Sequence, residues 1–208
     1  MNELSLENNN VIFHEMMSHP ALFSHPSPKK VAVIGDDGRI LSEILKHETI
    51  TELWHIAETK TALSDDRIRF YSSDNSDWIQ GAKKNDFDIV INLSRADAES
   101  MSRFFDLLHT DGVLIQESGS PFHLAELKQS ANFIQAAGFA DLHVLNFPQP
   151  SFSSGWRAAL MARKEGHLKR VREKDVFNRK FKTVYYNFDI HKASMALPEF
   201  LRQEGIPL

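Results

Sequence analysis

Acidic side chains follow several short apolar segments of the chain, at points where the strands of a sheet would end. Asp36 and Asp37 lie in the turn 35–38, Glu58 follows a second apolar segment and Asp74 follows a third. Adjacent carboxylates would repel a phosphate, so the turn is a poor match to the dinucleotide-binding pattern. Carboxylates suit a ligand that carries an amine and hydroxyl groups, such as a cationic nucleoside. The alternative is that an acid of the turn only caps the following helix and that Glu58 is a surface residue.

The backbone of the same turn also favours a ligand site. Gly35 and Gly38 permit a tight connection and a close approach of the backbone to a ligand. The helix that follows would offer free N–H groups. We therefore predict Gly35, Asp37, Gly38, Glu58 and Asp74 as candidate residues for binding a nucleoside-like ligand.

The histidines near the N-terminus do not form a metal-binding pattern. His14, His19 and His25 are five and six residues apart, which fits neither one helix face nor a common zinc motif. The chain has no cysteine, which excludes disulfides, thiolate ligands and a cysteine nucleophile. A G-x-S-x-G turn is also missing. We predict no metal site and no serine-hydrolase site.

Composition narrows the class of protein. The chain has 208 residues, of which 42% are apolar and 25% charged, as in a soluble globular domain. The net charge of −4 favours neither nucleic acid nor an anionic membrane as a partner. No apolar run is long enough to span a bilayer, and residues 1–10 lack the features of a signal peptide. We predict a cytoplasmic protein.

The elements that must position these residues alternate between strands and helices. Strands are predicted at 31–35, 53–57, 67–71, 88–93, 113–115, 143–147 and 156–161. Helices are predicted at 39–47, around Trp78, at 96–109 and at 123–137. A turn is predicted at Asp111–Gly112. The alternation predicts an α/β fold, a Rossmann-like doubly wound sheet that is mostly parallel with an antiparallel edge.

Three stretches of the chain resemble spermidine synthases and related polyamine aminopropyltransferases. They are Phe13-His14-Glu15-Met16-Met17 to Pro26, Gln116 to Phe122, and Tyr185-Tyr186-Asn187 to Pro198. The resemblance implies a sheet of the S-adenosylmethionine-methyltransferase type. It also implies transfer of an aminopropyl group from decarboxylated S-adenosylmethionine, as co-substrate, to a diamine such as putrescine. The family needs no metal or other cofactor. The resemblance divides the chain into a residual N-terminal segment, 1–28, and a Rossmann-like aminopropyltransferase domain, 29–208.

The resemblance assigns roles to individual residues. Asp37, within the turn of Gly35 and Gly38, matches the acid that contacts the amine end of the donor, and Asp74 matches the acid at the adenine. The acid at the ribose falls on Ala57, with Glu58 one position later. On the substrate side the matched residues are His14, Glu15, Glu117 and Phe152. Phe13 and Phe152 stand where the family has tyrosine, and Glu117 where it has glutamine.

The match is incomplete at the reacting centre. The catalytic aspartate of the family falls on Leu93 and its partner on Ala96, and Asp97 can substitute only if the loop shifts. The helix between the second and third strands is missing, and most of the N-terminal β-domain is missing too. A pocket without this wall and lid would be open to water, which weakens electrostatic catalysis.

Three functions follow as hypotheses. The first is a divergent but active aminopropyltransferase that acts on a small diamine. The second is a catalytically silent binding or interaction protein on the same fold, which the apolar residues at catalytic positions favour. A small-molecule methyltransferase is a third and weaker hypothesis. A homodimer is a candidate assembly, although the usual dimer-forming domain is nearly absent.

Overall fold

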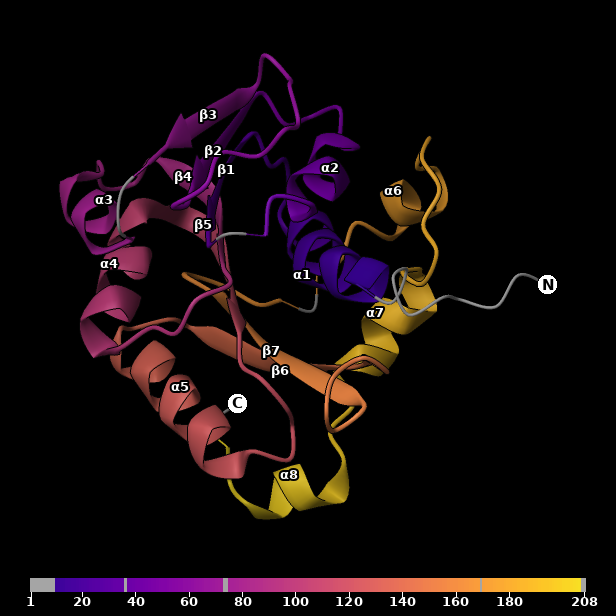
Figure 1. The fold of residues 1–208 in the computed structure, drawn as a ribbon. Helices are drawn as coiled ribbons and strands as arrows, with labels where there is room; N and C mark the ends of the chain where they lie inside the picture. The colour runs from indigo at the N-terminus through magenta and orange to yellow at the C-terminus, as the bar shows by residue number, and fades with distance from the viewer. Residues whose placement is uncertain (1–9, 36, 73–74, 169, 207–208) are drawn as a thin grey trace.

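Seven strands form one sheet in the computed structural model, which describes residues 10–35, 37–72, 75–168 and 170–206 (Figure 1). The strands are β1 Lys30–Ile34, β2 Glu52–Ile56, β3 Ile68–Tyr71, β4 Phe87–Asn92, β5 Leu108–Glu117, β6 Asp141–Pro148 and β7 Trp156–Arg163. Their order in the sheet is β3-β2-β1-β4-β5-β7-β6. The first five strands pair in parallel, and β7 is antiparallel to both β5 and β6. The predicted fold class, with its antiparallel edge, is confirmed.

The central strands are apolar because both faces of the sheet are covered. In β1, Val31 to Ile34 are fully buried, and in β4 Ile89 to Ile91 are too. Ile34 pairs with Ile56 of β2 and with Asn92 of β4. The carboxyl ends of neighbouring parallel strands therefore meet at one edge, where ligands bind in such sheets.

Helices cover the two faces of the sheet as two groups (Figure 1). One group consists of α1 Asn10–Ser24, α2 Ile40–Leu45, α6 Glu173–Phe177 and α7 Phe188–Ser194. The other consists of α3 Asn75–Gly81, α4 Ala98–Leu107, α5 Leu124–Ala136 and α8 Glu199–Gln203. No helix of the described part of the chain is long and apolar enough to cross a membrane.

Helix α1 is part of the core, although its sequence belongs to the predicted residual N-terminal segment. Every residue from Ile12 to Ser24 is buried, including the polar ones. Met16, Met17 and Leu22 are fully buried in the same apolar cluster as β1 and β4. The division of the chain at residue 28 stays a prediction, but the described part of that segment is a layer of the fold.

Two predicted elements differ from the structure. The predicted turn at Asp111–Gly112 lies inside β5, which begins at Leu108, directly after α4. The register of β5 against β4 shifts between Phe87 and Ile89. Asp111 and Gly112 lie in this irregularly paired part of β5, so the strand continues through them. The helix predicted at 39–47 is shorter, from Ile40 to Leu45. Residues 57–67, between β2 and β3, contain no helix, as the sequence predicted.

Candidate active site

The turn after β1 lies directly against the end of β4. Gly35 has φ +122°, and a Cβ atom at this position would lie 2.9 Å from the Cβ of Leu93. Only glycine adopts this conformation readily and leaves room for Leu93. A Cβ atom on Gly38 would lie 2.7 Å from the Cβ of Thr61, so the loop after β2 packs on the turn.

Asp37 is held by a residue of α1. The Nε2 atom of His14 lies 2.7 Å from the Oδ2 atom of Asp37, and the backbone N–H of Arg39 donates to Oδ1. Burial would raise the pKa of Asp37, but the interactions with His14 and Arg39 together outweigh it and hold that pKa below its usual value. The structure thus joins two predicted site residues, His14 and Asp37, in one pair.

Of the other acids predicted for the donor side, only Glu58 lies in the described part of the chain. Glu58 is an exposed residue, one position after buried Ala57. Asp74 lies outside the described residues, as does Asp36. Their assignment to the ribose and adenine of a donor stays a prediction.

The loop after β4 presents apolar side chains where the family resemblance places carboxylates. Leu93 packs on the cluster that contains α1, and Ala96 packs on the cluster of the opposite face. Asp97 is the N-cap of α4, and its Oδ1 atom accepts a hydrogen bond of 2.9 Å from the N–H of Ser100. That bond holds the pKa of Asp97 below its usual value. Asp97 therefore has a structural role as a helix cap, and its catalytic role stays a prediction.

A buried amide network fixes the ends of β4 and β5. The Nδ2 atom of Asn92 donates to the Oε1 atom of Gln116 at 2.7 Å and to the carbonyl of Ser94 at 2.8 Å. Gln116 Nε2 donates to the same carbonyl at 2.9 Å. Sequence reasoning missed Asn92. Its polar side chain directly after the apolar run 89–91 was the available signal.

A cavity of about 390 Å³ lies next to this network, between the β4–α4 loop, the end of β5 and α5. Its lining includes two predicted substrate residues, Glu117 and Phe152. Arg95, Arg157 and Glu126 also line it, so the cavity has charges of both signs. Asp37 and Asp97 are not among its lining residues.

Arg157 of β7 lines this cavity and contacts three other residues of the site. The carbon atom of its guanidinium lies 4.5 Å from the ring centroid of Phe13 and 4.5 Å from that of Phe152. Its Nη1 atom lies 3.4 Å from the Oε1 atom of Glu117. Sequence reasoning missed Arg157. Its signal was a charge in an apolar strand, on the same face as buried Ala159 and Met161.

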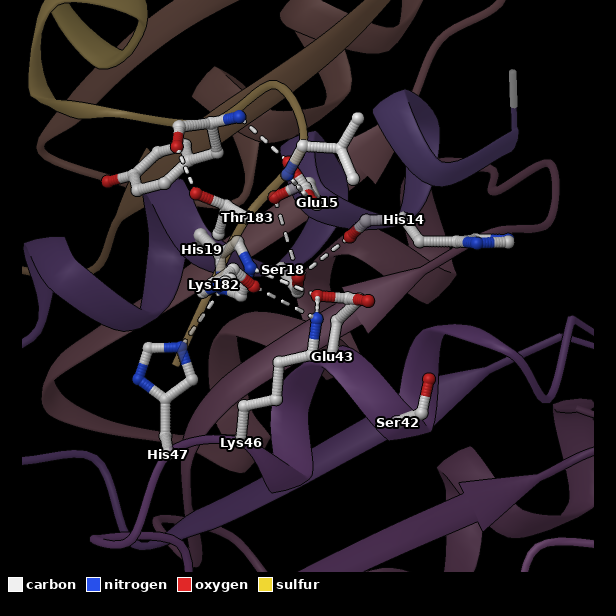
Figure 2. Close-up of polar contacts among 12 residues, drawn as sticks. His14, Glu15, Ser18, His19, Ser42, Glu43, Lys46, His47, Lys182 and Thr183 are labelled. Atoms are coloured by element: carbon white, nitrogen blue, oxygen red, sulfur yellow. Dashed lines mark hydrogen bonds and ion pairs between the residues drawn. The ribbon is translucent and has the colours of Figure 1, made fainter. Parts of the chain in front are cut away.

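Glu15, predicted on the substrate side, has a structural role. Its carboxylate accepts hydrogen bonds from the backbone N–H groups of Val184, Tyr185 and Tyr186, at 2.6, 2.8 and 2.7 Å. Figure 2 shows Glu15 beneath the C-terminal segment that contains Thr183, whereas the ring of His14 points away from this contact. The carboxylate therefore fastens α1 to a segment about 170 residues later in the chain.

His19, one helical turn after Glu15, makes polar contacts with α2 and with the residue that follows its C-cap. Its Nδ1 atom lies 3.0 Å from His47 Nε2 and its Nε2 atom 3.2 Å from Glu43 Oε2, to which Lys46 also donates (Figure 2). Burial lowers the pKa of His19 against the opposing effect of Glu43, and it lowers the pKa of His47 to about 2. His19 therefore links α1 to Glu43 of α2 and to His47, which follows that helix.

The C-terminal stretch packs on the N-terminal one. The ring of Tyr186 stacks on Phe23 at 5.8 Å and lies 5.1 Å from His19, and its hydroxyl is 2.8 Å from His191 Nδ1. Burial lowers the pKa of His191 to about 4. Two stretches that share a family resemblance are thus in contact. Within the described ranges, no group of three His, Asp or Glu side chains is placed to hold a metal ion.

Comparison with known proteins gives concordant matches. Residues 10–57 match the family model described as "Spermine/spermidine synthase domain". The polyamine aminopropyltransferase of Nitrosococcus oceani is 36% identical, over 93% of this chain and 76% of the relative. That of Halorhodospira halophila is 34% identical, over 94% of this chain and 80% of the relative.

Solved structures agree with the sequence relatives. The spermidine synthase of Thermotoga maritima superimposes with a TM-score of 0.88 at 27% identity, covering 95% of this chain and 75% of that one. A spermidine synthase structure in complex with the transition state analogue AdoDATO gives the same values for TM-score and identity. A methyltransferase from Burkholderia thailandensis, at 16% identity, has a TM-score of 0.54 over 74% of this chain and 80% of that one, and shares the fold alone.

Proposed function

The chain belongs to the polyamine aminopropyltransferase family, and from this premise we propose that it is a catalytically silent member, a binding or interaction protein on the family's fold. The observation that carries the proposal is the side chain of Leu93, at the position to which the resemblance assigns the catalytic aspartate. It packs against the apolar core instead of offering a carboxylate.

Aminopropyl transfer to a diamine needs a group that accepts a proton, because an amine attacks only in its neutral form. Neither Leu93 nor Ala96 can accept one. Three of the described carboxylates near this position are held within the chain. Asp37 is paired with His14, Glu117 with Arg157, and Asp97 caps α4.

A second candidate function is a divergent, active aminopropyltransferase. It is favoured by the relatives named polyamine aminopropyltransferase, which match over 76–80% of their own length. Its substrates would be decarboxylated S-adenosylmethionine and a diamine such as putrescine, with no metal or other cofactor. A homodimer and a cytoplasmic location stay predictions under both candidates.

An activity assay separates the two candidates. The purified protein is incubated with decarboxylated S-adenosylmethionine and putrescine, with the Thermotoga maritima spermidine synthase as a positive control, and spermidine is measured by mass spectrometry. We expect no spermidine above the level without protein. Spermidine that is formed by the wild type and lost in Asp37→Asn, but kept in the control Asp66→Asn, would establish the active candidate. Asp66 is an exposed acid of the β2–β3 loop and matches the change in charge.

A further inference from the structure

A second cavity, of about 380 Å³, lies where the C-terminal ends of α1 and α2 meet the segment that contains α6. Phe23 lines it from α1, residues 46–49 line it from the end of α2, and the other lining residues lie between 172 and 181. Helix α6 packs on α1 in this part of the molecule (Figure 1). No residue is shared with the lining of the cavity beside Glu117. We call this second cavity the α2–α6 cavity, and it is separate from the candidate active site.

Aromatic rings form one side of the α2–α6 cavity. The ring centroids of Phe23 and Phe181 lie 6.5 Å apart with their planes at 24°, and the ring of His47 lies 4.9 Å from each. Burial lowers the pKa of His47 to about 2, so this ring is uncharged at neutral pH. Ring faces of this kind suit the planar, apolar body of a ligand.

The same cavity carries more positive than negative side chains. The cations and then the acids of its lining are Lys46, Arg172, Arg179 and Lys180, and Glu48 and Asp175. Glu48 and Asp175 are 74% and 54% exposed, whereas Lys46 and Arg172 are only 32% and 23% exposed. Water and salt screen the exposed acids more strongly than the partly buried cations. The inner part of the cavity is therefore the more positive part.

Arg179 differs from the other three cations of the cavity. Each of those pairs with a carboxylate: Lys46 with Glu43, Arg172 with Asp175 and Lys180 with Glu48.

The partners of Arg179 within the described ranges are neutral. Its Nη1 atom donates to the carbonyl of Val176 and its Nη2 atom to the hydroxyl of Thr183 at 2.8 Å. Its Nε atom is buried and has no hydrogen-bond partner among the described residues. A fixed guanidinium with a spare donor matches an oxyanion in both charge and geometry.

We propose that the α2–α6 cavity binds an aromatic oxyanion, a phosphate or carboxylate on a planar apolar body. The oxyanion lies at Arg179 and the planar body on the rings of Phe23 and Phe181. The volume of about 380 Å³ is in the range of small-molecule sites. The proposal goes beyond the proposed function and does not depend on it, because the two cavities share no lining residue.

The test is a titration that locates the ligand and removes the guanidinium. Naphthyl phosphate, naphthoate and inorganic phosphate are added to the wild type, Arg179→Gln and Arg103→Gln, and binding is followed by amide NMR shifts. Arg103 is the matched control, since its guanidinium also donates to a backbone carbonyl but does not line this cavity.

We expect the wild type and Arg103→Gln to bind at least one naphthyl probe, with the largest shifts in residues 46–49 and 175–181. Arg179→Gln should bind that probe at least about tenfold more weakly. The preferred naphthyl probe decides between phosphate and carboxylate. Equal binding by Arg179→Gln, no shifts in these two segments, or equal affinity for inorganic phosphate would overturn the proposal.

A second variant decides the matter if Arg179→Gln does not fold. Glu48→Gln removes an exposed negative charge from the rim and frees Lys180, so it should bind the naphthyl probe about two- to fivefold more tightly than the wild type. Glu165→Gln, at an exposed position outside the cavity, is the control and should leave the affinity unchanged. The gain should shrink as salt is added. An affinity of Glu48→Gln no higher than that of the control would contradict the proposal.

Discussion

The carboxylate of Glu15 links the two ends of the described chain through three hydrogen bonds, and its removal tests that link. Glu15 is fully buried and accepts three backbone hydrogen bonds from the segment 184–186. In Glu15→Ala these N–H groups lose their acceptor. The segment would then be held by aromatic packing, such as that of Tyr186 and Phe181 on Phe23.

The magnitude follows from how many of the three donors are shielded from water. A hydrogen bond to a charged group contributes about 1.5–3 kcal/mol, so two such bonds contribute roughly 3–6 kcal/mol. We count only the amides of Tyr185 and Tyr186, because Val184 is exposed and its N–H can bind water. Removal of Glu15 also removes the cost of burying a carboxylate, which places the net loss near the lower end, about 3 kcal/mol. For a chain of this size that loss lowers Tm by about 6–12 °C.

The assay is urea unfolding at pH 7.5, followed by circular dichroism and by fluorescence of the three tryptophans. Glu165→Ala, at an exposed loop position, is the matched control for the loss of one negative charge. Hydrogen exchange should also accelerate at the amides of residues 184–186 in Glu15→Ala. A loss below about 1 kcal/mol, or no change in exchange, would refute the assignment of Glu15 as this anchor.

Three other predictions concern pH, the cap of α4 and the turn after β1. His47 and His191 have pKa values lowered to about 2 and about 4, so the unfolded chain binds more protons as the pH falls below about 6.5. The free energy of unfolding should be highest above that pH and should fall toward pH 4. At pH 5 each histidine should lower it by about 2 kcal/mol. Equal unfolding free energies at pH 7.5 and pH 5 would contradict this prediction. Asp97→Ala should lower stability by about 1 kcal/mol through the lost N-cap, whereas Asp97→Asn should cost less, and calorimetric Tm values check this. Gly35→Ala should cost at least about 1–3 kcal/mol because φ is positive and Leu93 blocks the methyl group, and a variant as stable as the wild type would argue against this turn geometry.

The sheet could be predicted from the sequence because its central strands contain uninterrupted apolar runs, at 31–34 in β1 and 89–91 in β4, and turn residues separate the strands. The start of β5 could not, since Asp111–Gly112 has the composition of a turn, and it stays in the strand through irregular pairing with β4 and a hydrogen bond from the N–H of Lys164 to the carbonyl of Gly112. Helix α1 gave no periodic signal. A helix buried on nearly all sides has no polar face, and its residues are buried without interruption from Ile12 to Ser24.

Residues of the candidate site could be predicted from the sequence, but the contacts between their side chains could not. Asp37, Glu117 and Phe152 could be named from the sequence, yet the partners that decide their chemistry come from distant segments. His14 reaches Asp37 across 23 residues, and Arg157 reaches Glu117 from another strand. Side-chain pairing across such distances depends on the packing of α1 and β7, which local patterns do not encode.

The contact between Glu15 and residues 184–186 also determines when α1 can become stable during synthesis. The helix is among the earliest described parts to be made, but the N–H groups that satisfy its buried carboxylate follow about 170 residues later. At about 5–20 residues per second, a ribosome needs on the order of 10–30 s to produce them. Throughout that interval the carboxylate of Glu15 lacks the three N–H groups that satisfy it in the folded chain. Helix α1 is therefore made early but completes its hydrogen bonds only after residues 184–186 have been made.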